Sequence, residues 1–412
     1  MLNARVCVVT AGHLSTCPRM LKAADALAGA GYDVRVVSTN HTPWAAVTDR
    51  KVLATRAWAS TVVDYGRDTA RAMQVATGVR LHAARVASAT VGADRVSMPV
   101  AIRAYSRIHD ELVEAVAAEP ADFVYGGTTG ALAAVAESAD RLRVPYGIDF
   151  EDLYSGEHAP DSEVTNVLAA RIERQVIAGA AFATAGSPMI ADAYEQAYGV
   201  RPIPVHNTFS VTRLETTGER VDRPLRLYWF SQTLGPGRGL EDILRGVGRM
   251  GRPVELHLRA RPIPSYLDSL LSLQREVAPN LQIVRHDPAA PDDMVRLAQS
   301  YDAGLACDEP LGRSRQFCLA NKIFTYLAAG VPVIMSRTPA QLKLEFCLDS
   351  AAFGYDCGDV EGIASVLSRL ASNPDLRTQA QSAARAVAER RWHWEHPEDR
   401  GALLAAVAGA IR

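Results

Sequence analysis

The chain has 412 residues, too many for one ordinary hydrophobic core, so we expect two domains of roughly 150–200 residues each. Its 44 basic and 46 acidic side chains give a formal charge of −2, which excludes the basic footprint of a duplex nucleic-acid binder. The sequence has no signal-peptide pattern and no run of about 18 uncharged apolar residues, so we expect a cytoplasmic protein. The six cysteines form no Cys-x-x-Cys pair and are predicted to be reduced, mostly buried thiols.

The first half of the chain alternates short apolar strands with helical patterns. Residues 4–10 (ARVCVVT) and 33–38 (DVRVVS) are predicted strands, and a helix over 18–30 lies between them. This βαβ start predicts a right-handed, parallel, doubly wound unit. The first loop lacks Gly-x-Gly-x-x-Gly, so it does not favour a dinucleotide site. Three further strands are predicted at 123–126, 144–148 and 181–185.

Long helical patterns interrupt this alternation between residues 42 and 119. Within them, residues 67–107 hold seven arginines and two aspartates, a local charge of 7 − 2 = +5. This segment would suit contact with a membrane surface or with an anionic acceptor. We favour the simpler interpretation, which is that the arginines lie on the solvated faces of amphipathic helices.

The second half of the chain repeats the alternation. Residues 208–220 (TFSVTRLETTGER) have no periodicity and are predicted to link two domains. Strands are then predicted at 225–230, 254–258, 281–284, 303–306 and 331–335. The predicted organisation is a first domain over 1–207, a linker over 208–220, a second domain over 221–390 and a last helix within 391–412.

The stretch 311–336 (LGRSRQFCLANKIFTYLAAGVPVIMS) carries the strongest functional signal. It is predicted to form a polar loop, a helix that ends at Gly330 and a buried parallel strand. Backbone N–H groups at the start of a helix, together with the helix dipole, make an anion site. Lys322 falls on the first turn, where a lysine is unfavourable unless an anion binds nearby. The alternative is a surface lysine without a ligand.

This stretch resembles the donor-binding motif of the family 4-like glycosyltransferases of the GT-B fold. The resemblance rests on Asn321, Lys322, Phe324, Tyr326, 328–330 and Pro332, and further similarity lies at 16–38, 146–157 and 198–207. Both carboxylates of the family's Glu-x7-Glu pair are absent, because Phe317 and Thr325 occupy their positions.

The resemblance implies an α/β protein with two doubly wound Rossmann-like domains facing an interdomain cleft. The second domain would bind a nucleotide diphosphate sugar, a UDP- or GDP-sugar, and the first domain an acceptor. The last helix would cross back to the first domain. No prosthetic group is expected, and the lack of an Asp-x-Asp sequence between strands favours a transferase that needs no metal.

Candidate catalytic residues follow predicted strands, where ligands of open parallel sheets bind. Arg238, in the loop SQTLGPGRG (231–239), and Lys322 are expected to stabilise the charge of the leaving diphosphate. A plain turn explains this loop about as well. Glu151, in the acidic loop GIDFEDLYSGE (147–157), replaces the family's histidine and is the best general-base candidate. Its alternative is an exposed loop that caps a helix.

The other candidates form two groups. The donor-binding candidates are Gly12, Ser231, Gln232, Gly237, Gly239, Arg259, His286, Ser314, Arg315, Phe317, Leu319, Ala320, Asn321 and Thr325. The acceptor-binding candidates are His13, Gly127, Thr128, Asp149, Asp152 and Tyr154.

We therefore expect a retaining glycosyltransferase that moves a hexosyl or related sugar to a natural-product-type small molecule or to a glycan. The departures from the motif suggest an unusual sugar donor or a thiol acceptor. The alternatives are a catalytically inactive GT-B protein that binds a nucleotide or sugar, and a nucleotide-sugar epimerase on the same fold. The identities of the base, sugar and acceptor, and a homo-oligomeric state, are left open.

Overall fold

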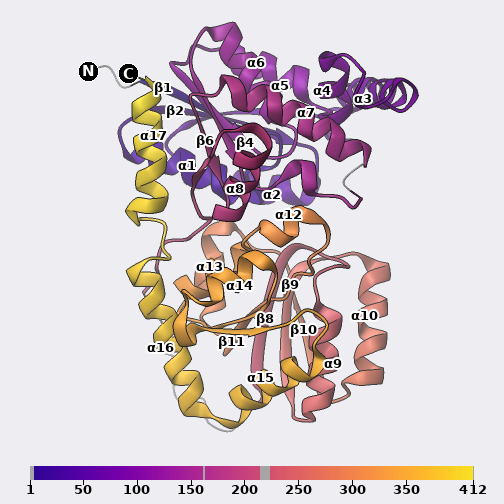
Figure 1. Cartoon of the computed structure of the whole chain (residues 1–412), viewed down its shortest axis with the longest axis vertical. Helices are drawn as coiled ribbons and strands as arrows, with labels where there is room; N and C mark the ends of the chain where they lie inside the picture. Colours follow the sequence, from indigo (N-terminus) through magenta and orange to yellow (C-terminus); the bar gives the residue numbers. More distant parts are fainter. Residues whose placement is uncertain (1–3, 161–162, 214–222, 412) are drawn as a thin grey trace. The chain divides into compact units, whose positions relative to one another are not determined.

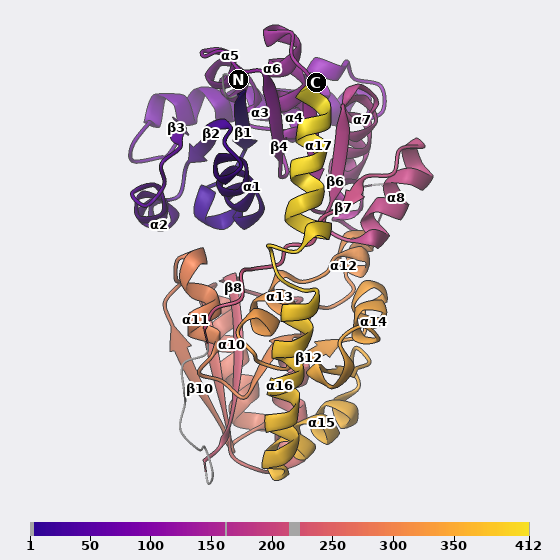
Figure 2. The same cartoon turned by 90° about the vertical axis from the view of Figure 1, so that its left-hand side faces the viewer.

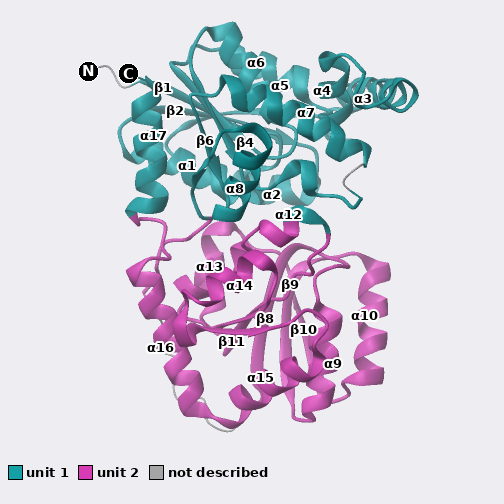
Figure 3. Ribbon diagram, viewed as in Figure 1, with its two compact units in different colours: residues 1–206, 312–314, 397–412 teal, residues 207–311, 315–396 magenta. Residues whose placement is uncertain are grey.

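The computed structural model describes residues 4–160, 163–213 and 223–411. The chain divides into two compact units, which are coloured separately in Figure 3. Unit 1 comprises residues 1–206, 312–314 and 397–412, and unit 2 comprises residues 207–311 and 315–396. The predicted linker lies partly outside the described residues.

Unit 1 is built on a parallel sheet of seven described strands in the order β3-β2-β1-β4-β5-β6-β7 (Figure 1). The chain winds from β1 to one edge of the sheet and then returns to add β4 on the other side of β1, which creates a topological switch point between these two strands. The strands are β1 (Arg5–Thr10), β2 (Asp33–Asn40), β3 (Ala59–Asp64), β4 (Phe123–Gly127), β5 (Tyr146–Phe150), β6 (Phe182–Ala185) and β7 (Ile203–Pro204).

Helices lie on both sides of this sheet (Figures 1 and 2). Helix α8 shows how the sequence sets their ends, since the Ser187 hydroxyl accepts a hydrogen bond from the Ile190 N–H at 3.1 Å. Gly199 ends α8 in the left-handed region, at φ 74°. The helices are α1 (Pro18–Gly29), α2 (Pro43–Leu53), α3 (Arg71–Val91), α4 (Met98–Tyr105), α5 (His109–Ala117), α6 (Leu132–Leu142), α7 (Val164–Gly179), α8 (Pro188–Tyr198) and α17 (Ala402–Ile411).

Unit 2 repeats the winding with a parallel sheet of six described strands in the order β10-β9-β8-β11-β12-β13. Its switch point lies between β8 and β11. The two sheets confirm the predicted α/β class with two doubly wound domains. The strands are β8 (Leu225–Leu234), β9 (Val254–Pro262), β10 (Leu281–His286), β11 (Ala303–Ala306), β12 (Val333–Ser336) and β13 (Ala352–Tyr355).

The helices of unit 2 include the one predicted from the donor motif. This helix, α13, begins at Asn321, and Gly330 follows it at φ 70°, as predicted. The predicted polar loop before it contains a short helix, α12 (Gly312–Phe317), whose residues are divided between the two units. The other helices are α9 (Leu240–Met250), α10 (Pro264–Val277), α11 (Met294–Ala298), α13 (Asn321–Ala328), α14 (Pro339–Glu345), α15 (Val360–Ser372) and α16 (Pro374–Arg390).

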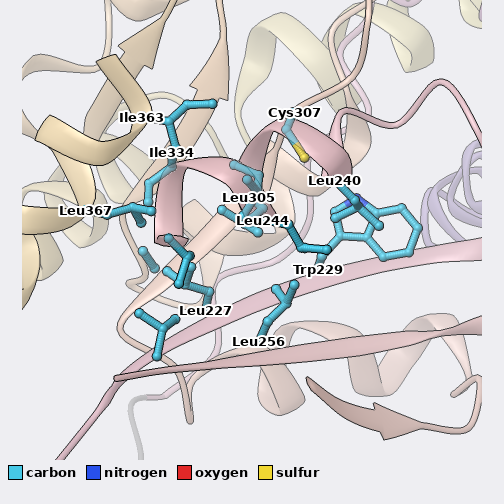
Figure 4. Close-up of a cluster of buried hydrophobic side chains, with 14 of the residues drawn as sticks. Leu227, Trp229, Leu240, Leu244, Leu256, Leu305, Cys307, Ile334, Ile363 and Leu367 are labelled. Atoms are coloured by element: carbon cyan, nitrogen blue, oxygen red, sulfur yellow. The ribbon is translucent and has the colours of Figure 1, made fainter. Parts of the chain in front are cut away.

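A buried apolar cluster supports the switch point of unit 2 (Figure 4). Trp229 of β8 is fully buried and packs in this cluster with Leu240 at the start of α9 and with Leu305 of β11. Burying one such leucine stabilises the fold by about 1.5–3 kcal/mol. Buried packing therefore holds the strands β8 and β11, from which the loops of the switch point start, in place.

Two further observations concern the whole described chain. None of its helices is both long and apolar enough to cross a membrane. Cys7, Cys17 and Cys307 are buried, Cys318 is half-buried, and Cys347 and Cys357 are exposed. The prediction of mostly buried thiols is therefore wrong for half of them.

Candidate functional site

The switch point of unit 2 gathers two cationic side chains around one carboxylate. Asp308, which follows β11, accepts hydrogen bonds from Lys322 Nζ at 3.0 Å and from Arg238 Nη1 at 3.2 Å. The structure thus brings together the two predicted catalytic cations of this unit. Burial opposes ionisation of Asp308, but the charges of Lys322 and Arg238 outweigh it and lower the pKa of the carboxyl group. Asp308 is therefore ionised at neutral pH.

The backbone around Asp308 is held by buried polar side chains. The Ser336 hydroxyl donates to the Asp308 carbonyl at 2.7 Å. Gln341 Nε2 in turn donates to the Ser336 carbonyl at 2.8 Å and to the Ser336 hydroxyl oxygen at 3.1 Å. These bonds tie the loop after β11 to the end of β12 and to α14, so the position of the carboxylate is set by the fold.

The glycine loop between β8 and α9 lies against this charged group. Gly239 has φ 66°, and a Cβ atom there would be 2.0 Å from the Cys307 carbonyl oxygen, so only glycine fits. Gly237 has φ 73°, and its carbonyl accepts a hydrogen bond from Arg315 Nη1 at 2.7 Å. Arg315, a predicted donor-binding residue, is thereby brought beside Arg238.

Two helices of unit 2 start near these cations without a side-chain cap. Gly239 precedes α9 and Ala320 precedes α13, and neither supplies a capping side chain. The first backbone N–H groups of both helices are thus not bonded by a capping side chain, which suits an anion. The first turn of α9 also carries Glu241 and Asp242, which favour the helix dipole but would repel an anion placed close to them.

A second group of predicted donor-binding residues meets at the ends of β9 and β10. Arg259 and His286 are register partners in the sheet. Arg259 donates to the Tyr228 hydroxyl at 2.9 Å and to the Asp287 carbonyl at 2.7 Å. His286 Nε2 lies 2.9 Å from His257 Nδ1. Burial, followed by nearby cations, lowers the pKa of His286, so its ring is neutral at neutral pH.

The loop predicted after β8, residues 231–239, begins too early. The strand continues to Leu234, so Ser231 and Gln232 lie inside it, at an irregularity of register between Phe230 and Thr233. Bulges of this kind re-aim side chains near functional sites.

The residues at the two positions of the missing carboxylate pair differ in burial. Thr325 is fully buried, and its hydroxyl donates to the Asn321 carbonyl at 3.3 Å, one helical turn earlier. Phe317 is half-buried at the end of α12. Leu319, Ala320 and Asn321 are also half-buried, whereas Ser314 is buried and belongs to unit 1.

In unit 1, the acceptor-binding candidate Asp149 is buried and hydrogen-bonded to other side chains of the same unit. Its two carboxylate oxygens accept hydrogen bonds from Arg19 Nε at 2.8 Å and from Arg19 Nη2 at 2.5 Å. The Thr184 hydroxyl donates to the same carboxylate at 2.5 Å, and Asp149 is only 1% exposed. Acceptor binding by Asp149 stays a prediction, but these bonds favour a role in fixing the loop that follows β5.

His13 is also held by unit 1 itself. Its Nδ1 lies 2.6 Å from Asp49 Oδ2, while its Nε2 accepts the backbone N–H groups of His41 and Thr42 at 3.1 and 2.9 Å. Because Nε2 accepts, the ring proton lies on Nδ1. Both ring nitrogens are therefore used to fix the loop after β1.

The switch point of unit 1 joins Thr128 to the loop that contains Gly12. Thr128 has φ 81°, and its Oγ1 lies 3.3 Å from the Thr10 hydroxyl and accepts the Ala11 N–H at 3.2 Å. At Gly127, a Cβ atom would meet Asp149 Cβ at 2.7 Å, so internal packing requires that glycine. At Gly12, a Cβ atom would have its nearest neighbour 3.7 Å away, so internal packing does not require glycine there. That Gly12 contacts a ligand stays a prediction.

The loop after β5 places several carboxyl groups at the same edge of the sheet. Burial, with a contribution from Asp152, raises the pKa of Glu157 to about 7. The Tyr154 hydroxyl is buried and has no hydrogen-bond partner among the described residues. Burial, then the charges of Glu151 and Asp152, raise the pKa of Tyr154 well above its ordinary value. Glu151 also contributes, after burial, to the raised pKa of Cys17, about 12, so its negative charge acts on the start of α1.

Two residues of these sites were missed in the sequence. Asp308 follows a correctly predicted strand, and that position was the signal that could have found it. Glu157 was inside the acidic loop that the sequence singled out, but its burial could not be predicted from the loop composition.

Comparisons with known proteins agree with this architecture. A family model described as a glycosyl transferase 4-like domain matches residues 18–207, and a model described as glycosyl transferase-like matches residues 264–399. A search of curated proteins found no match.

Solved structures with the same fold include three bacterial proteins. Anabaena Alr3699/HepE, in complex with UDP and glucose, is 14% identical, with 99% of each chain covered and a TM-score of 0.70. A variant of S. aureus TarM is 7% identical, with 99% of this chain and 100% of that chain covered and a TM-score of 0.68. A glycosyltransferase from Rickettsia africae ESF-5 is 11% identical, with 100% and 98% covered and a TM-score of 0.66.

Two doubly wound units, each with polar loops at its switch point, define the chain as a protein of the GT-B fold. Because the two family models together cover most of its length, the chain belongs to the glycosyltransferases. The predicted glycosyltransferase family and enzyme class are confirmed.

Proposed function

We propose that this glycosyltransferase uses a nucleoside diphosphate sugar, which unit 2 binds at its switch point. The observation that carries the proposal is that Arg238 and Lys322 both reach Asp308, with Arg315 bound to the adjacent glycine loop. Three cations at the carboxyl ends of β8 and β11, beside uncapped helix starts, suit a diphosphate. The similar Anabaena protein was crystallised with UDP and with UDP-glucose, which supports a donor of this class.

The nucleoside would extend from the diphosphate towards the ends of β9 and β10. Arg259 and His286 lie there, and the Asp287 carbonyl is already engaged by Arg259. A fully buried threonine at position 325 cannot take the place of a carboxylate that holds ribose hydroxyls, because its own hydroxyl is bonded inside α13. We propose that the ribose is held by other groups, and that UDP- and GDP-sugars are the donors to test first.

Chemically, the acceptor oxygen or sulfur bonds to the anomeric carbon while the bond from that carbon to the diphosphate breaks. Arg238 and Lys322 stabilise the negative charge that develops on the leaving diphosphate, the task for which other enzymes use a metal ion. We propose retention of the anomeric configuration, with the leaving diphosphate or Glu151 receiving the acceptor proton. The acceptor is a small molecule or a glycan bound by unit 1, near Gly12 and the loop after β5.

Donor turnover tests this proposal directly. The full chain is incubated with UDP- and GDP-sugars, and release of the nucleoside diphosphate is measured with and without alcohol and thiol acceptors. Lys322→Ala and Arg238→Ala should each lower the rate about 100-fold or more, the usual effect of removing one charge-stabilising group. Lys343→Ala is the matched control, because Lys343 is an exposed lysine at the end of α14. No release and no binding with any donor would refute the proposal.

The same assay separates two other functions. A catalytically inactive binding protein would gain thermal stability with the nucleotide, by about 2.7 kcal/mol at 100 times the Kd, but would release none from the sugar. An epimerase would convert the donor without an acceptor. A putative-epimerase structure from Listeria monocytogenes shares the fold at 13% identity, which supports the fold alone.

A further inference from the structure

We propose that Asp308 is a positioning residue of the donor site, which keeps Arg238 and Lys322 in place and whose negative charge competes with that of the diphosphate for these two cations. The inference rests on the proposed donor site and adds a residue and a role to it. Asp308 would thereby limit the affinity for the nucleoside diphosphate product and speed its release.

The first argument is the shared carboxylate. One oxygen of Asp308 takes the bond from Arg238 and the other takes the bond from Lys322. The side chains of Lys322 and Asp308 are 10% and 14% exposed, so water screens them poorly. Two cations held this close would repel each other without the carboxylate between them. Asp308 therefore sets the spacing of the two groups that are expected to meet the diphosphate.

The second argument is that Asp308 cannot easily leave. Its backbone carbonyl is bonded by Ser336, and Gln341 holds Ser336 through two further bonds. The backbone that carries the carboxylate is therefore held in place when a ligand arrives. A lysine has three N–H donors and an arginine has five, so both can serve Asp308 and a phosphate at once. The diphosphate then meets two positive charges together with a fixed negative one, and it is held less tightly than by the cations alone.

The third argument is a contrast with Asp302, at the other end of β11. Asp302 is 4% exposed, and it accepts hydrogen bonds from Arg223 Nη1 and Nη2, both at 2.8 Å, and from the Arg226 backbone N–H at 2.8 Å. It lies at the amino end of the strand, where ligands of parallel sheets do not bind. Two aspartates thus flank one strand, a buried one at its amino end and a half-buried one at its carboxyl end, and of these two Asp308 pairs with the predicted catalytic cations.

Binding of pyrophosphate, UDP and GDP, measured by titration calorimetry, tests the inference. Pyrophosphate carries the phosphates without a base. For Asp308→Asn we expect about tenfold tighter binding, since one neighbouring negative charge is removed, and a lower kcat because product release slows. For Asp308→Glu we expect weaker binding than in the wild type, because the longer side chain pushes its carboxylate further among the donors. Asp302→Asn should lower thermal stability and leave the affinity unchanged.

The opposite signs of the two Asp308 variants distinguish competition from a structural role, which would weaken binding in both. Equal or weaker binding by Asp308→Asn, with its circular dichroism unchanged, overturns the inference. If Asp308→Asn does not fold, Asp308→Ser takes its place as the uncharged variant, with the same tighter binding expected, and equal or weaker binding overturns the inference. A wild type that binds pyrophosphate but no UDP, GDP or sugar nucleotide would refute the proposed function and leave this comparison intact.

Discussion

Replacing Gly12 by alanine asks whether this glycine is kept for a ligand. A Cβ atom at position 12 would meet the Thr16 and Thr10 hydroxyl oxygens at 3.7 and 3.8 Å, which are ordinary contacts. Folding should therefore tolerate Gly12→Ala, with a change in unfolding free energy of at most about 1 kcal/mol and in the stabilising direction. A ligand packed on the Gly12 backbone would instead be displaced by about 1 Å, which costs about 100-fold in rate.

The measurements are urea unfolding and nucleoside diphosphate release by the same preparation. The matched control is Gly239→Ala, because at position 239 a Cβ atom would lie 2.0 Å from a carbonyl oxygen at φ 66°. That control should lose stability, by more than the 1–2 kcal/mol that the left-handed conformation alone costs. Full activity in Gly12→Ala would refute the reasoning, as would a stability loss as large as that of Gly239→Ala.

Three further predictions concern unit 1 and the cysteines. Asp149→Ala should cost about 3–5 kcal/mol in urea unfolding, because it leaves a buried arginine unpaired. Glu157 has a pKa of about 7 in the folded chain and an ordinary value of 4.5, so unfolding free energy should fall as pH rises between these values, and Glu157→Gln should remove that slope. A thiol reagent should label exposed Cys347 quickly, whereas Cys17, which is buried and has a pKa of about 12, should react only on unfolding.

Each of these three predictions has its own control or contradicting outcome. Asp122→Ala removes an exposed pair, in which Asp122 is 40% exposed, and should cost less than about 1 kcal/mol; an equal cost would contradict the argument from burial. If the unfolding free energy of Glu157→Gln still falls with rising pH, the pH dependence arises from another titratable group. Because Cys357 is exposed as well, Cys347→Ser should remove one thiol from the fast labelling phase and leave that of Cys357, and a fast phase of unchanged amplitude would contradict the argument.

Most of the fold could be predicted because its strands are short apolar runs. The prediction for β11 matched at both ends, and β1, β2 and β4 shifted by one or two residues. The strand β3 was missed because it lies at the edge of the sheet, is largely exposed and carries no apolar alternation. The strand β7 was missed because it is only two residues long, and β13 because only Phe353 and Tyr355 of its four residues are buried and it contains Gly354.

The sites were less predictable than the fold, because their partners are far apart in the sequence. Arg19 and Asp149 are separated by 130 residues, and nothing in either segment indicates the pair. Arg238 and Asp308 are separated by 70 residues. The motif identified Lys322 through its unfavourable place on a helix. The structure was needed to show that Asp308, at the end of β11, offsets its charge.

The order in which the segments of the two units follow each other along the chain has a consequence for folding during synthesis. Asp399 is fully buried, and its Oδ1 accepts the His206 backbone N–H at 2.8 Å and lies 2.9 Å from His206 Nδ1. Unit 2 is thus encoded inside unit 1. On the ribosome, the unit translated first would be completed last, after residues 397–411 emerge, while the inserted unit already has all its parts.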